Sequence, residues 1–295
     1  MERLLHSLAR PLTLAALAFV AGPVRASEDP VDLRHLQGLG AVRYHHLESK
    51  LLERGFHIFV RLPESYAESD AERFPTLYLL DGGITFPLLG AYYRYLSLAG
   101  EVPDMILVGI SYGTEDWRQG NLRSTDFTAP SPERGHYGGA ARFQDVLRTE
   151  LLPLIEGRYR SDATRRVIFG QSLGGQFVLF TALTDSRLFW GHIASNPALH
   201  RNLEFFLRPA AVLESEDRGK PADGRAGQAR PRVFVSVAEL DEERFREPAV
   251  RWVEHWTGRQ GVRWELRVVT LEGHGHFSAA PEAFRRGISW VFGEG

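Results

Sequence analysis

The residues of this chain that could do chemistry centre on one serine. Ser172 lies in the segment Gly170-Gln171-Ser172-Leu173-Gly174, with Gly175 directly behind it. Glycine two positions before and after a serine is typical of a sharp strand-to-helix turn, because glycine lets the strand and the helix pack closely. The apolar run before this segment favours a strand, and the run after it favours a helix. The pattern predicts a nucleophilic hydroxyl at Ser172; the alternative is a glycine-rich turn with an incidental serine.

A negative oxygen forms on a carbonyl that such a hydroxyl attacks, and backbone N–H groups can stabilise it. We expect the N–H of Leu173, at the start of the helix, to be one donor. A second donor should come from the loop after an early strand, where Asp81-Gly82-Gly83 allows close approach of the backbone. Gly83 is therefore the second candidate.

The hydroxyl also needs a base, and histidine is the usual one. Among the 11 histidines, His274 and His276 follow the last apolar run. We favour His276, because Phe277 and Ser278 lead from it into the final predicted helix, and we expect His274 to support the site or a substrate loop. In the rival interpretation His274 and His276 chelate a metal, but no cysteine or carboxylate pair completes such a site.

A carboxylate should orient the histidine, hold its tautomer and stabilise its charged form. Such an acid is expected after the predicted strand that begins at residue 233, one strand before the strand that leads into the histidine loop. Residues 237–243 contain both Glu239 and Asp241. We favour Asp241, which lies three residues beyond Ala238, and keep Glu239 as the alternative.

The elements that must position these residues alternate along the chain. Apolar runs that end in loops predict strands within 76–83, 105–113, 165–175, 191–197, 233–241 and 264–276. Amphipathic or apolar stretches predict helices at 141–159, 174–184, 247–258 and 281–292. In the first of these, one stripe comprises Phe143, Val146, Leu147, Leu151, Leu154 and Ile155. Two earlier segments, 41–49 and 56–63, predict an antiparallel strand pair with its turn at 53–55.

This alternation predicts an α/β class with a mostly parallel sheet covered by helices on both faces, as in the α/β-hydrolase fold. Residues 27–295 should form one domain. The segment 214–231 is charged, rich in glycine, proline and alanine, and poor in large apolar residues. We interpret it as a mobile surface loop.

The first 26 residues predict a cleaved export signal. Arg3 and Arg10 precede the apolar run 11–21, and 24–26 offers small residues at a cleavage site. A bilayer span needs about 20 apolar residues, so an anchor is the weaker interpretation. We therefore expect a periplasmic or secreted protein without an integral membrane segment after signal removal.

Composition excludes several classes of site and partner. The chain has no cysteine, so it has no disulfide, thiol nucleophile or cysteine-ligated metal. The formal net charge of −2 does not favour nucleic acid, which calls for a clustered basic face. We expect no metal and no organic cofactor, and a small-molecule ester as the partner.

Several segments resemble one esterase family of the α/β-hydrolase superfamily, which includes enterochelin and other siderophore esterases, esterase D relatives and feruloyl esterases. The similar segments are YLLDGG (78–83), RSTDFTAP (123–130), FQDVLRTELLPLIEGRYR (143–160), GQSLGG (170–175), ASNPAL (194–199) and GHGHFSA (273–279). The resemblance implies serine-dependent ester hydrolysis through an acyl-enzyme, with Ser172 and His276 matched by motif. It supports Asp241 less, because the family's acid region varies.

Substrate contacts are predicted from position alone. The loop 111–127 follows the carboxyl end of a predicted strand, where open α/β sheets bind ligands. Trp117, Arg118 and Arg123 could meet an aromatic, anionic ester there, as in siderophore-type substrates. Alternatively, Arg123 pairs with Asp126 and braces the loop. A non-catalytic binding module and an acyltransferase are the rival functions.

Overall fold

The computed structural model describes residues 36–208 and 230–293. All of them belong to one compact unit, Leu33–Gly295. The predicted export signal at 1–26 and residues 214–229 of the predicted loop lie outside the described residues. Within the described ranges, no helix is both long and apolar enough to cross a membrane.

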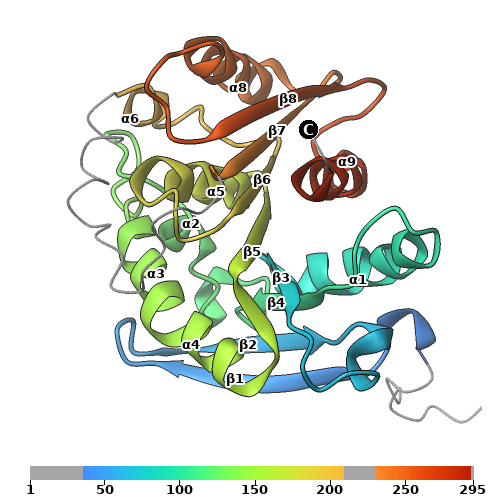
Figure 1. The fold of residues 1–295 in the computed structure, drawn as a ribbon. Coiled ribbons are helices and arrows are strands. Elements are labelled where there is room, and N and C mark those ends of the chain that lie inside the picture. Colours follow the sequence, from blue (N-terminus) through green and yellow to red (C-terminus); the bar gives the residue numbers. More distant parts are fainter. Residues whose placement is uncertain (1–35, 209–229, 294–295) are drawn as a thin grey trace, which may run out of the picture. The chain divides into compact units, whose positions relative to one another are not determined.

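In residues 36–208 and 230–293, eight strands form one sheet in the order β1-β2-β4-β3-β5-β6-β7-β8 (Figure 1). The strands are β1 Val42–Ser49, β2 Arg54–Arg61, β3 Phe74–Leu79, β4 Ile106–Ser111, β5 Ser161–Gln171, β6 Gly191–Ser195, β7 Arg232–Ala238 and β8 Glu265–Leu271. β2 is antiparallel to both β1 and β4, and every pairing from β4 through β3 to β8 is parallel. The predicted fold, a mostly parallel sheet with an antiparallel N-terminal pair, is confirmed.

The turn of that first pair lies slightly earlier than predicted. Ser49 pairs with Arg54, so residues 50–53 form the turn and 54–55 already belong to β2. Glu53 has a positive φ of 53° and completes the reversal. A position with positive φ is commonly glycine, so the sequence pattern favours a turn that includes Gly55, whereas the positive φ falls on Glu53.

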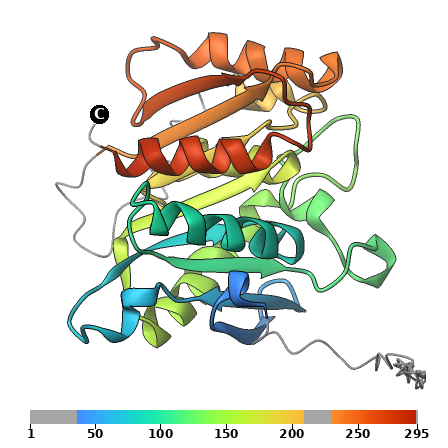
Figure 2. The ribbon, with the colours of Figure 1, turned by 90° about the vertical axis from the view of Figure 1, so that its right-hand side faces the viewer.

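Helices cover both faces of the sheet, as Figure 1 shows edge-on, and Figure 2 shows one of these helical layers in front of the strands. They are α1 Gly82–Leu98, α2 Arg123–Asp126, α3 Ala140–Val146, α4 Leu152–Arg158, α5 Leu173–Thr184, α6 Leu203–Phe206, α8 Glu243–Trp256 and α9 Ala280–Phe292, with short 3₁₀ segments η2 Gln37–Leu39, η3 Glu64–Ala67 and η4 Trp117–Gln119. α1 and α9 share one apolar cluster on one face, while α3 to α6 and α8 pack on the other. Central strands β3, β4 and β6 are buried along their whole length, as expected between two helical layers.

The helix predicted at 141–159 is not uniform. Between α3 and α4 it contains a π-helical turn, η5 Leu147–Leu151. A π turn adds one residue relative to α-helical spacing, so the buried stripe advances by one position. Leu152 is consequently buried, whereas Leu154 is only partly buried, which corrects the predicted stripe.

Helix α1 was not predicted. Its sequence contains Pro87, which removes one N–H from the helical ladder, and it begins with two glycines. Phe86, Leu89, Tyr93 and Leu96 are nevertheless buried against the sheet and α9. Tertiary packing therefore outweighs the poor local helix propensity.

The carboxyl ends of β3 to β8 lie at one edge of the sheet, because these strands are parallel. Five loops with candidate residues leave from that edge: β3 runs into α1, β4 into the loop with η4 and α2, β5 into α5, β7 into the Asp241 loop and β8 into the His276 loop. The fold thus brings together residues that lie up to about 190 positions apart in the chain.

Candidate active site

Ser172 stands on a strained turn between β5 and α5. Its φ is 58° and its ψ is −114°, a backbone conformation that non-glycine residues rarely adopt. The turn is possible because the flanking glycines leave no side chain in the way: a Cβ on Gly170 would lie 2.3 Å from the carbonyl carbon of Gly174. A Cβ on Gly175 would lie 2.8 Å from the carbonyl oxygen of Ser195. We call residues 170–175 the elbow.

Three predicted side chains meet in a hydrogen-bonded row. The hydroxyl Oγ of Ser172 lies 2.9 Å from Nε2 of His276. Nδ1 of His276 lies 2.7 Å from Oδ2 of Asp241. A carboxylate accepts hydrogen bonds, so Nδ1 carries a proton and Nε2 is free to accept the hydrogen of Ser172. The side chains of His276 and Asp241 are only 10% and 3% exposed, which shields the hydrogen bond between them from water.

Of the two candidate acids, Asp241 makes the histidine contact. The other carboxylate oxygen of Asp241 accepts a bond from the backbone N–H of Glu242, 2.8 Å away, which steers the side chain. Glu239 instead accepts a bond from the backbone N–H of Gly273, 2.8 Å away. Glu239 therefore ties its loop to the histidine loop without touching the imidazole.

The backbone and ring of His276 are held by residues that sequence reasoning missed. Its carbonyl oxygen accepts bonds from the side-chain amides of Gln171, directly before the nucleophile, and of Asn196 at the end of β6. Phe245 of α8 stacks on the imidazole, with ring centroids 4.5 Å apart and planes at 27°. Gln171 was visible within the elbow motif, but no local pattern signals the other two.

His274 lies outside this row. Its Nδ1 lies 2.8 Å from the carbonyl oxygen of Glu272, and its own carbonyl accepts a bond from the N–H of Leu240. The geometry gives no support to the rival chelate, because both ring nitrogens of His276 make hydrogen bonds to Asp241 and Ser172. In the described part of the chain, no group of three or more His, Asp or Glu side chains could hold a metal.

The candidate N–H donors lie at the starts of two helices. Leu173 is the first residue of α5, and Gly83 is the second residue of α1, so neither N–H has an acceptor within its own helix. The two helix starts are neighbours: a Cβ on Gly174 would lie 3.5 Å from Cβ of Leu80 and 3.6 Å from Oδ2 of Asp81. Gly82 presses against β4, where a Cβ would lie 2.4 Å from the N of Ile110.

Arg123 binds an acid other than the predicted one. Its Nε and Nη2 donate to the two oxygens of Asp81, at 2.7 and 2.8 Å, as a two-pronged ion pair. Asp126 pairs with Arg54 instead and accepts a bond from the Tyr112 hydroxyl at 2.7 Å. The predicted pairing of Arg123 with Asp126 is therefore wrong. Burial by itself would lower the pKa of the Arg123 guanidinium. The negative charge of Asp81 and its hydrogen bonds outweigh this effect, so the pKa of Arg123 is raised.

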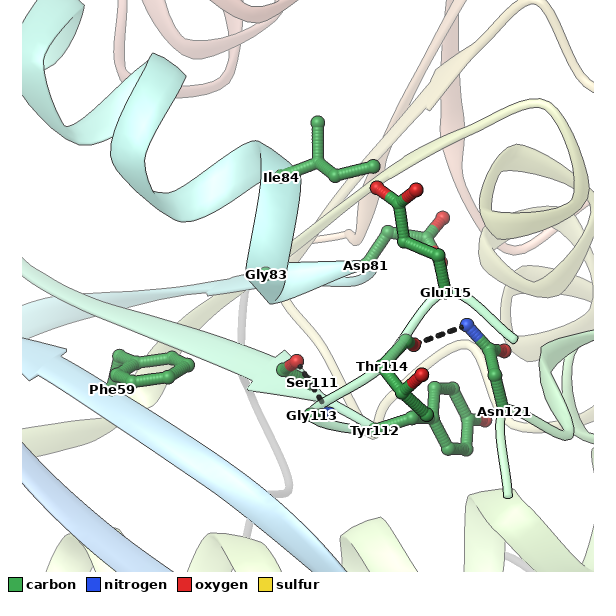
Figure 3. A pocket seen from close by; sticks show the side chains of 10 residues that line it. All are labelled: Phe59, Asp81, Gly83, Ile84, Ser111, Tyr112, Gly113, Thr114, Glu115 and Asn121. Atoms are coloured by element: carbon green, nitrogen blue, oxygen red, sulfur yellow. Dashed lines mark hydrogen bonds between the residues drawn. The ribbon is translucent and has the colours of Figure 1, made fainter. Parts of the chain in front are cut away.

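A pocket of about 280 Å³ opens between the start of α1 and the loop that follows β4 (Figure 3). It is lined by Phe59, Asp81, Gly83, Ile84, Ser111, Tyr112, Gly113, Thr114, Glu115 and Asn121. Its walls combine apolar surface with a few polar groups, as ligand pockets commonly do. Its position next to Gly83 suits a substrate group attached to the attacked carbonyl.

The other predicted substrate residues stand apart from the pocket lining. Trp117 belongs to η4 and its side chain is strongly exposed, with the guanidinium of Arg118 at 5.1 Å from its ring. Arg123 is not part of the pocket lining, but its ion-pair partner Asp81 is. Substrate contact by Trp117 and Arg118 stays a prediction.

Comparisons with known proteins agree on one family. The profile of the family described as "Putative esterase" matches residues 49–276. The ferri-bacillibactin esterase BesA of Bacillus subtilis is 29% identical over 269 residues, which cover 83% of this chain and 87% of BesA. The apo-salmochelin esterase of Escherichia coli is 28% identical over 171 residues, covering 55% of this chain and 52% of that protein.

Solved structures agree on the fold. The crystal structure of the BES protein from Bacillus cereus matches with a TM-score of 0.74 at 22% identity, covering 92% of this chain and 99% of that chain. The family match spans well over half of the chain. This chain therefore belongs to that esterase family and is a carboxylic-ester hydrolase with an α/β-hydrolase fold.

Proposed function

We propose that the chain is an exported serine esterase that works through an acyl-enzyme. The observation that carries the proposal is the continuous row of hydrogen bonds from Asp241 through His276 to Ser172. Residue types in this order are those that activate a serine hydroxyl in hydrolases.

In the first half-reaction, Nε2 of His276 takes the proton of Ser172 as Oγ attacks the ester carbonyl. The carbonyl oxygen becomes negative and accepts bonds from the N–H groups of Leu173 and Gly83. When this intermediate collapses, the ester C–O bond breaks and His276 gives its proton to the departing alcohol. Asp241 stabilises the imidazolium meanwhile.

In the second half-reaction, water replaces the alcohol. His276 takes a proton from the water, whose oxygen attacks the acyl carbon, and the same two N–H groups stabilise the second oxyanion. Collapse breaks the bond to Ser172 Oγ, which recovers its proton from His276 and releases the carboxylic acid. No metal or organic cofactor enters either half-reaction.

Replacement of the nucleophile tests this mechanism. We expect Ser172→Ala to lower kcat on an aryl ester by a factor on the order of 10⁴ to 10⁶, since the hydroxyl forms the covalent intermediate. A fluorophosphonate probe should label the wild-type chain at Ser172 and leave the variant unlabelled, as shown by peptide mass spectrometry. Ser69→Ala, in a surface turn, is the matched control and should keep full turnover and labelling. A Ser172→Ala variant with wild-type kcat would remove the proposal.

We further propose siderophore-type or other aromatic esters as substrates. The names of BesA and of the apo-salmochelin esterase support this class, and the pocket beside Gly83 offers Phe59 and Ile84 as apolar contacts. Simple aryl esters, feruloyl sugars and a catecholate trilactone, compared by kcat/KM, test the choice. A lower kcat/KM for both the feruloyl sugars and the trilactone than for a simple aryl ester contradicts it. Acyl transfer to an added alcohol that outcompetes water would instead indicate an acyltransferase.

Export is proposed from the N-terminal sequence: two arginines, the apolar run 11–21 and small residues at 24–26. A chain recovered from the periplasm or medium should begin at Ser27. Recovery of uncleaved chain from the cytoplasm alone would contradict export.

A further inference from the structure

We propose that Arg123 is a positioning residue that keeps the carboxylate of Asp81 away from the N–H of Gly83, so that this N–H stays available to the oxyanion. The inference rests on the proposed function, in which Gly83 is an oxyanion donor. It assigns a role to an ion pair, Asp81–Arg123, that lies outside the hydrogen-bonded row of Asp241, His276 and Ser172.

The first observation is the conformation of Asp81. It is the N-cap of α1, yet its φ and ψ are 54° and 41°, in the left-handed region that side chains disfavour. Such strained non-glycine residues tend to persist where surrounding contacts hold them. The contact here is the two-pronged pair with Arg123, whose side chain is 31% exposed against 17% for Asp81.

The second observation is a missing cap. Aspartate is a favoured N-cap because its carboxylate accepts a bond from the second or third N–H of the helix. In the described structure the Asp81 side chain makes no such bond. The third N–H, of Ile84, already bonds the Asp81 carbonyl at 2.9 Å, so the N–H of Gly83 is the natural target of a capping carboxylate.

A capping carboxylate would compete with the reaction in two ways. It would occupy the hydrogen bond of Gly83, and it would place negative charge where the oxyanion develops. Arg123 prevents both, because its fork binds both carboxylate oxygens and neutralises them. The close approach of Asp81 to the elbow, seen at Gly174, makes this position sensitive.

The test combines loss and rescue. In Arg123→Met the carboxylate is released, and we expect kcat on a soluble aryl ester to fall about ten- to hundredfold, approaching the loss of one oxyanion donor, with KM changed less than about threefold. In Arg123→Met/Asp81→Gly no carboxylate remains, and glycine accepts the left-handed backbone without strain. We expect kcat of the double variant to be at least about tenfold higher than kcat of Arg123→Met.

Binding of an aryl trifluoromethyl ketone gives a second readout. Its adduct with Ser172 carries an oxyanion, so its Ki should weaken in Arg123→Met in proportion to kcat/KM and recover in the double variant. The matched control is Arg54→Met, which breaks the pair with Asp126 on the same short helix α2. It should lower thermal stability without changing the ratio of Ki to KM.

Two results would overturn the inference: wild-type kcat in Arg123→Met, or a double variant no more active than Arg123→Met, which would indicate a packing or substrate-binding role. Fluorophosphonate labelling separates this from the proposed function. If Ser172 is labelled and required while Arg123→Met behaves as wild type, the serine mechanism stands and the positioning role fails.

Discussion

At the scale of single residues, which group donates each hydrogen bond matters as much as the distance between the atoms. Asp241 can only accept from His276, and this leaves Nε2 of the ring to accept from Ser172. Phe245 fixes the plane of the same ring from α8. Two acidic residues in one loop thus have different tasks, since one orients the imidazole and the other ties two loops together.

This difference predicts unequal effects of two matched substitutions. Asp241→Asn keeps the shape but offers an amide N–H to Nδ1 and favours the wrong tautomer, so we expect kcat to fall on the order of 10³- to 10⁴-fold. Glu239→Gln can still accept from the N–H of Gly273, so kcat should stay within about threefold of wild type. Steady-state kinetics on an aryl ester compares them. Equal losses would assign both carboxylates to the histidine.

At the scale of elements, the packing of β5 against α5 produces the strained turn at Ser172. Two of the elbow glycines, Gly170 and Gly175, have backbone atoms where a Cβ would be, whereas a Cβ on Gly174 would meet only side-chain atoms at ordinary contact distance. Residue type at these positions is therefore dictated by packing between elements, apart from any role in catalysis.

Alanine substitutions at two glycines test this. Gly170→Ala forces a Cβ against the backbone of Gly174, and we expect it to lower the free energy of unfolding by about 3 kcal/mol or more. Gly157→Ala, in α4, meets nothing within 4 Å and should raise that free energy by about 0.5 to 1 kcal/mol, because alanine loses less entropy in a helix. Urea unfolding followed by circular dichroism measures both. A stable Gly170→Ala would show that β5 and α5 can separate.

At the scale of the whole molecule, one histidine couples folding to pH. His192 in β6 is fully buried, and within the described structure neither ring nitrogen has a hydrogen-bond partner. Burial lowers the pKa of His192 to about 3. An unfolded chain takes up this proton near its ordinary pKa of about 6.5, so acid favours unfolding between about pH 6.5 and 3.

We therefore expect the free energy of unfolding to contain a contribution from His192 that is complete above about pH 6.5 and falls by about 2 kcal/mol at pH 5. His192→Leu fits the apolar site and should flatten this part of the pH dependence. Urea unfolding at pH 7.5 and 5 measures the difference. His136→Gln, at an exposed site, is the control and should keep the wild-type slope. Equal slopes for wild type and His192→Leu would contradict the coupling.

The sequence by itself determined the succession of strands along the chain, the glycine-flanked turn at Ser172 and the loop that carries His276. These follow from local patterns, because burial alternates with the period of each element and glycine marks close approach. Where local signals conflicted with packing, as in α1 with Pro87 or in the π turn after Val146, the sequence pattern was insufficient.

Only the tertiary structure decided which of Asp241 and Glu239 reaches His276, and that Arg123 binds Asp81 and not Asp126. Each choice depends on distances between side chains remote in sequence. Hydrophobic periodicity indicates which face of an element is buried, but it does not indicate which residue a charged side chain on a loop will bind. That is settled when the carboxyl ends of the parallel strands are brought to one edge of the sheet.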